Sequence, residues 1–156
     1  MDTYFDLGGY SFPVTTQSTE AQTWFDRGIL WTYGYNHEEA VTCFERAIDA
    51  DPKCAMAHWG AGYASGPNYN MPWDLFDDAG RAAAARAGYA HARKALDMID
   101  GVTRWEAALI NALPARYPQP EPLDPEAMKA WNVDFADAMR DVFAVHPESH
   151  EVRTVF

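Results

Sequence analysis

The stretch Gly66–Trp73 holds the side chains of this chain that are best suited to binding a ligand. Asn68 and Asn70 carry amide groups, which both donate and accept hydrogen bonds. Tyr69 and Trp73 add flat aromatic faces. Two prolines interrupt the helical patterns around them, and a loop on a rigid scaffold commonly carries function. The alternative is structural: the prolines shape a turn, the asparagines cap helices and the aromatic rings fill the core.

Histidines offer a second kind of chemistry, which is metal binding. A site needs three or four converging ligands, and the HxxxH spacing from His146 to His150 is interrupted by Pro147. His37 falls in a predicted turn and His58 on the following predicted helix. We therefore predict no metal and no cofactor, with His37 and His58 as the alternative pair of ligands.

Nucleophilic catalysis is not favoured by these residue patterns. No serine stands in a GxSxG turn, and Cys43 and Cys54 fall at helix positions that predict burial as small apolar side chains. The paired acids Glu38–Glu39 and Asp77–Asp78 fall at predicted helix starts, where they complement the helix dipole.

Helical periodicity organises the elements that must position these groups. Thr19 and Gln22 predict a capping box at the start of a first helix, Asn36 predicts the cap of a second, and Thr103 with Glu106 predicts a later box. The residues between the first two caps carry large and small side chains in a fixed register: Trp24, Gly28, Trp31, Ala40, Phe44, Ala47 and Pro52.

This register resembles the tetratricopeptide repeat, a helix pair of about 34 residues with a large residue, a small one four later, then Ala, aromatic, Ala and Pro. The resemblance implies packing, in which Gly28 lets the paired helix approach closely. Segments Tyr35–Ala40 and Gly66–Asn70 also resemble the N-terminal part of larger bacterial and fungal tetratricopeptide-containing proteins. That likeness implies a fold and no defined activity.

We predict an all-α, tetratricopeptide-like solenoid of about three helix pairs. An extended segment, 1–18, precedes a helical repeat domain, 19–156. The predicted units of that domain are a regular repeat at 21–54, expanded repeats at 55–101 and 102–147, and an incomplete final helix at 148–156. We expect that final helix to lack the partner that would bury it, so a second chain completing the solenoid, as in an oligomer, is one predicted partner.

The family resemblance also implies a concave groove lined by the first helix of each pair. The groove residues it implies are aromatic or apolar with one acid: Phe25, Asp26, Ile29, Tyr33, Trp59 and Tyr63. Because this set lacks cations, a peptide carboxylate is disfavoured and an apolar or cationic segment or an aromatic molecule is favoured. The alternative is that Tyr4–Val14 or a neighbouring subunit covers the groove.

Composition limits the remaining function classes. A net charge of −11 argues against nucleic acids and anionic membranes, whose binding needs a cationic face. The chain shows no signal peptide or apolar run of spanning length, so a cytoplasmic location is the expectation. We predict a protein-binding or assembly module. The alternative is an enzyme or enzyme subunit, possibly metal-dependent, with a pocket between groove and loop.

Overall fold

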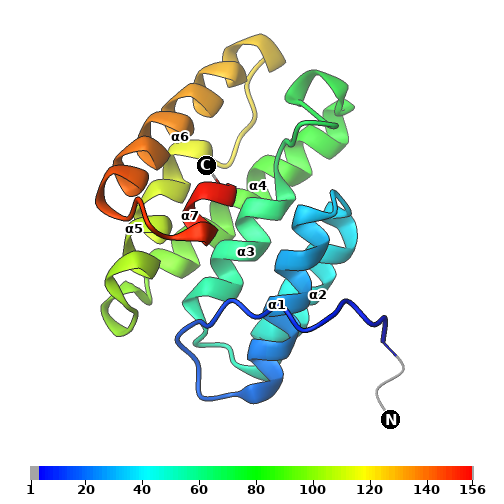
Figure 1. Ribbon diagram of the computed structural model, residues 1–156. Helices are drawn as coiled ribbons and strands as arrows, with labels where there is room; N and C mark the ends of the chain where they lie inside the picture. Colours follow the sequence, from blue (N-terminus) through cyan, green and yellow to red (C-terminus); the bar gives the residue numbers. More distant parts are fainter. Residues whose placement is uncertain (1–3, 156) are drawn as a thin grey trace.

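The computed structural model describes residues 4–155, and this part of the chain is all-α (Figure 1). It contains seven α-helices and three short 3₁₀ helices: α1 (Thr19–Tyr33), α2 (His37–Ala50), α3 (Ala55–Ser65), η1 (Trp73–Leu75), α4 (Asp78–Leu96), η2 (Ile99–Gly101), α5 (Arg104–Ala112), η3 (Leu113–Arg116), α6 (Pro125–Val145) and α7 (His150–Val155). None of the helices described is long and apolar enough to cross a membrane. Residues 1–3 of the predicted extended segment and Phe156 of the predicted final helix lie outside the described residues.

The helix starts follow the capping chemistry of the sequence with one correction. The Thr103–Glu106 capping box is present, and the Asn36 side chain accepts a hydrogen bond from the Glu39 amide at 3.3 Å. At α1, however, the cap is Ser18, whose hydroxyl accepts from the amide of Ala21 at 3.1 Å. Thr19 is instead the first helical residue, because the preceding serine already has the extended conformation that a cap requires.

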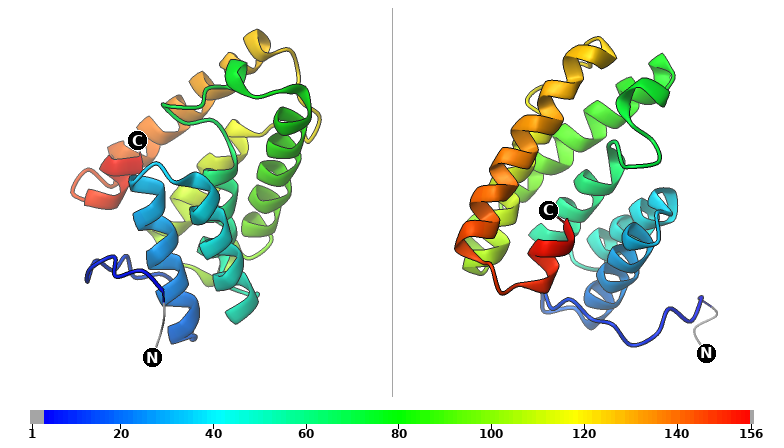
Figure 2. Two further views of the ribbon diagram at one scale, coloured as in Figure 1. Left: turned by 90° about the vertical axis from the view of Figure 1, so that its right-hand side faces the viewer. Right: turned by 45° about the horizontal axis from the view of Figure 1, so that its top comes forward.

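The helices α1 to α4 pack chiefly on their neighbours in sequence: α1 on α2, α2 on α3 and α3 on α4. Figure 2 shows α6 running beside α5 on the far side of α3 from the α1–α2 pair. The segment between α3 and α4 forms a tight turn, in which Asn68 and Met71 make an isolated bridge. α3 thus lies at the centre of the molecule and meets both halves.

The aromatic ring of Phe44 sets the close approach of α1, α2 and α3. A Cβ atom on Gly28 would lie 2.6 Å from this ring, and one on Gly60 would lie 2.4 Å from it. Both distances are far below a van der Waals contact, so only glycine fits at either position. The predicted role of Gly28 in a close helix approach is confirmed, and Gly60 does the same on α3.

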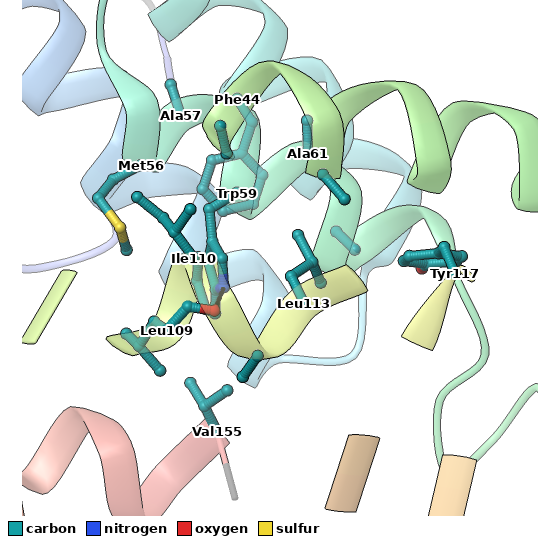
Figure 3. Close-up of a cluster of buried hydrophobic side chains, with 14 of the residues drawn as sticks. Phe44, Met56, Ala57, Trp59, Ala61, Leu109, Ile110, Leu113, Tyr117 and Val155 are labelled. Atoms are coloured by element: carbon teal, nitrogen blue, oxygen red, sulfur yellow. Dashed lines mark hydrogen bonds between the residues drawn. The ribbon is translucent and has the colours of Figure 1, made fainter. Parts of the chain in front are cut away.

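A cluster of buried apolar side chains surrounds α3 (Figure 3). Trp59 lies at its centre, with Phe44 from α2 and Leu109 from α5 nearby, and the Trp59 indole donates to the Leu109 carbonyl at 3.1 Å. The hydrogen bond satisfies the one polar atom of the indole. This cluster joins the α1–α3 half to α5.

The N-terminal segment lies against the helices, as expected for its apolar content. The carboxylate of Glu106 is fully buried and accepts from the Thr15 amide and hydroxyl, both at 2.6 Å, and from the Thr103 amide at 2.7 Å. Phe12 stacks on Trp105 with ring centroids 5.0 Å apart. The segment is therefore tied to the start of α5 by a buried, fully hydrogen-bonded carboxylate.

The final helix turns back onto the fold. We expected it to lack a burying partner, but Val152 and Val155 on α7 are both buried in the core. Figures 1 and 2 show α7 lying across the face of α3, between α6 and the α1–α2 pair. α7 therefore covers part of the surface that the sequence predicts as a groove.

Candidate ligand-binding pocket

A pocket of about 370 Å³ opens where seven segments meet. Its walls come from the end of α1, the start of α2, the end of α3, the turn after α3, η3, the middle of α6 and the end of α7. A volume of this size is at the lower end of the range for small-ligand sites. We call it the Arg116 pocket.

Aromatic rings form two walls of the Arg116 pocket. Tyr63 on α3 is stacked on the buried Trp59, with centroids 5.3 Å apart, and this contact fixes the tyrosine ring. Phe135 on α6 lies 6.2 Å from Tyr63. Tyr33 from α1 and Tyr69 from the turn add two further rings to the lining.

Arg116 lies between these walls with only 8% of its surface exposed. Its guanidinium carbon is 5.0 Å from the ring centroid of Tyr63 and 5.0 Å from that of Phe135, so both rings make cation–π contacts. One terminal nitrogen donates to the Pro67 carbonyl, while Nε is buried without a hydrogen-bond partner. The charge is thus held by two rings, the Pro67 carbonyl and the nearby Tyr117 hydroxyl.

Two further polar atoms of the lining are buried without a hydrogen-bond partner: the Tyr33 hydroxyl and Nδ1 of His37. Burial, followed by the neighbouring Tyr10, raises the pKa of Tyr33, so its hydroxyl keeps its proton. Burial lowers the pKa of His37; the Ala64 carbonyl opposes this and the charge of Arg116 adds to it. Near neutral pH the pocket therefore presents a neutral imidazole, a phenol and one cation.

The turn after α3 contributes Asn68 and Tyr69. The Asn68 carboxamide oxygen accepts from the amides of Asn70, at 2.9 Å, and Met71, at 3.1 Å. Because the oxygen is used inside the turn, the donor NH₂ group is the part of this side chain left for a ligand. Tyr69 is 89% exposed, so its ring extends the pocket wall into solvent.

A shallow groove continues from the pocket along the outer side of this turn. It has a volume of about 660 Å³ and shares Tyr35, His37 and Asn68 with the Arg116 pocket. Met71 and Phe76 add apolar surface to it. We call it the Met71 groove. Pocket and groove therefore adjoin at these three residues, and their linings mix aromatic and apolar with polar side chains.

Tyr35, at the junction of pocket and groove, has a left-handed backbone with φ of 60°. It ends α1: the amide of Tyr35 donates to Thr32 and that of Asn36 to Trp31. This is the Schellman arrangement, in which the left-handed position usually carries glycine. A tyrosine there is strained by about 1 kcal/mol, and such strain is common at binding sites.

Four of the ten predicted site residues meet in the Arg116 pocket: Tyr33, Tyr63, Asn68 and Tyr69. Another four, Phe25, Ile29, Trp59 and Trp73, lie in the core and are at most 1% exposed. Asp26 accepts from the Phe12 amide and so holds the N-terminal segment, and Asn70 is exposed beside the turn. Phe25, Ile29 and Trp59 share the helical period of the groove residues, so only the tertiary packing separates core from pocket there. Trp73 begins η1 and points into the core.

The histidines of the alternative metal pair serve different places. His37 lines the pocket, whereas the Nδ1 atom of His58 lies 3.2 Å from Nδ1 of His91 on α4. Burial, followed by His91, lowers the pKa of His58 to about 4. In residues 4–155 no group of three or more His, Cys, Asp or Glu side chains could hold a metal ion.

Arg116, Phe135 and Tyr35 are among the pocket residues that the sequence analysis missed. An arginine at a helix end normally predicts a favourable contact with the helix dipole, so its position alone gave no warning. Its neighbours, Leu113 and Tyr117, are both buried, and a cation inside an apolar run is the signal that could have indicated it. The predicted groove residues include no cation, but Arg116 lines the pocket beside two of them, Tyr33 and Tyr63. The expectation of a surface without a cation is therefore corrected.

No protein-family model matches this chain, and no curated protein or solved structure matches it either. The tetratricopeptide resemblance therefore rests on the seven residues in register between Trp24 and Pro52.

Proposed function

We propose that this chain is a binding module, built on tetratricopeptide-like helix pairs in a solenoid, which recognises a segment of a protein partner. The observation that carries the proposal is the continuity of the Arg116 pocket with the Met71 groove through Tyr35, His37 and Asn68. The pocket suits one aromatic or apolar group of the partner. The groove suits the chain that flanks this group.

Exposed apolar side chains support this use of the surface. Tyr35 is 57% exposed and Met71 37%, and both line the groove; Leu75, 60% exposed, lies four residues after Met71 in η1. Exposed apolar side chains that line a groove are typical of interaction sites. A helical scaffold with a preformed pocket loses little conformational freedom on binding, which favours a binding or assembly role. We propose a cytoplasmic location together with this role.

Selection of peptides from a random library on the immobilised full chain tests the proposal. We expect enriched peptides to share an aromatic or large aliphatic residue, and binding of a synthetic member to weaken about 10-fold in Tyr69→Ala, a typical loss for an aromatic contact residue. Phe5→Ala is the matched control, because Phe5 is 66% exposed and lines neither the pocket nor the groove. Absence of enrichment, or equal losses in the two variants, would contradict the proposal.

An enzymatic pocket is the second proposal, and His37 favours it. His37 lines the pocket, and burial lowers the pKa of its imidazole, which favours the neutral form that a general base requires. Mass spectrometry of a selected ligand after incubation with the protein tests it. Conversion of the ligand that is lost in His37→Gln supports an enzyme, and recovery of unchanged ligand supports binding alone.

A further inference from the structure

We propose that the Arg116 pocket takes a carboxylate: a singly charged organic anion whose carboxylate pairs with Arg116 and whose apolar or aromatic body lies between the rings of Tyr63 and Phe135. The inference rests on the proposed function and names the chemical class of group that the pocket accepts.

The first argument is an uncompensated charge. Arg116 is 8% exposed, and within residues 4–155 no carboxylate lies within ion-pair distance of it. The fourteen residues of the pocket lining include no aspartate or glutamate, although the chain as a whole has a net charge of −11. A buried cation is expensive unless an anion compensates it. A ligand carboxylate would supply that anion.

A purely structural role leaves much of this side chain unused. Arg116 ties the turn to η3 through one hydrogen bond to the Pro67 carbonyl. The guanidinium has five N–H donors, and Nε is buried without a partner. A neutral donor such as glutamine could make the single bond to Pro67. Retaining the charge in this position is explained by an anion that binds there.

The second argument is the match between the remaining lining and one carboxylate on an apolar body. The amide NH₂ of Asn68 is a donor, which suits an oxygen of an anion. The ring walls and Met139 suit a hydrocarbon body. One cation balances one negative charge, so a phosphate dianion would leave an uncompensated charge in the pocket, and a cationic ligand would meet Arg116 directly.

Isothermal titration calorimetry on the full chain tests the charge requirement without any mutation. The probes are 3-phenylpropionate, indole-3-acetate and hexanoate, each compared with its own amide. We expect at least one acid to bind about 10- to 100-fold more tightly than its amide, the range for one hydrogen bond to a charged group. Equal affinity of every acid and its amide, together with no acid preference among the peptides described below, overturns the inference.

Two arginine variants assign the effect to the pocket. Arg116→Met keeps the volume and removes the charge, and it should abolish the preference for the acid. Arg86→Met on α4 makes the same change in net charge at an exposed site and should retain the preference. Equal losses in both variants would indicate a general charge effect and overturn the inference. Arg116→Lys, which restores the charge, should recover part of the preference.

Peptides distinguish the two sources of such a carboxylate. A selected peptide with Asp or Glu beside its aromatic residue is compared with its Asn or Gln counterpart on the same three proteins. If only the peptides show a preference for the acid, the partner is a protein. If only the free acids show it, the ligand is a small molecule. Either result supports the inference. If the Asn or Gln peptides bind as well as the Asp or Glu peptides, and the amides bind as well as the free acids, the inference is overturned while the proposed function stands. No binding of any probe or peptide overturns both.

Discussion

The core around Phe44 and the pocket around Arg116 are built from different kinds of contact. Phe44 meets Gly28 and Gly60 on neighbouring helices, all within one stretch of the chain, and the three positions fit because two of them lack a side chain. The pocket instead joins α1, α3, η3, α6 and α7, which lie far apart in sequence. One region is closed and fully packed, whereas the other leaves polar atoms without partners.

The two regions therefore differ in what they contribute: the Phe44 core contributes stability, and the Arg116 pocket has the features of a binding site. Packing around Phe44 uses apolar surface and leaves nothing for a ligand. The pocket keeps a buried cation, an unpartnered imidazole nitrogen and a strained tyrosine, each of which costs stability. Such costs are retained at sites that bind something.

The largest expected effect separates these two regions directly. Phe44→Ala should destabilise the fold by about 3–5 kcal/mol, the usual cost of removing a buried aromatic ring. Arg116→Met should change the stability by about 1 kcal/mol or less, because an apolar side chain of similar volume replaces a buried charge. Urea unfolding followed by circular dichroism measures both. Similar losses in the two variants would break the comparison.

A smaller effect concerns the pH dependence of the free energy of unfolding, which comes from His58 on the side of α3 that faces α4. The pKa of His58 lies near 4 in the fold against 6.5 ordinarily, so the unfolded chain binds a proton between these values that the folded chain does not. Lys94 adds to this shift, and burial lowers the pKa of His91 while Glu45 opposes it. Stability should therefore be complete above pH 6.5 and fall as the pH decreases towards 4.

Replacing His58 measures this contribution. Between pH 6.5 and 4.5, we expect the wild type to lose about 2 kcal/mol more than His58→Gln, from the linkage of proton binding to unfolding. The exposed His150→Gln variant should follow the wild type and corrects for the titrating carboxylates. Parallel curves for wild type and His58→Gln would contradict a neutral, buried His58.

The smallest effect sharpens the comparison at the pocket entrance. Tyr35→Gly should stabilise the fold by about 0.5–1 kcal/mol, because glycine adopts the left-handed conformation without strain. The same variant should bind a selected peptide more weakly, since the ring is lost from the junction of pocket and groove. Thermal unfolding and calorimetry measure the two effects. A decrease in stability would show that the ring serves packing rather than binding.

The sequence by itself determined the helices, because capping and periodicity act over a few residues. Asn36 and Thr103 lie where the pattern predicts, and Gly28 meets Phe44 as expected. Caps and stripes depend on local hydrogen bonds and on burial of one helix face, so they are visible without a fold.

Only the tertiary structure decided which aromatic residues form a site. Trp59 and Tyr63 stand one helical turn apart, yet Trp59 is fully buried and Tyr63 lines the pocket. Arg116 acquires its role because η3 brings it beneath Tyr63 and Phe135, residues separated from it by long stretches of chain. Spacing sets the face of a helix to which a side chain belongs, but the segments that fold back onto that face determine whether it is core or pocket.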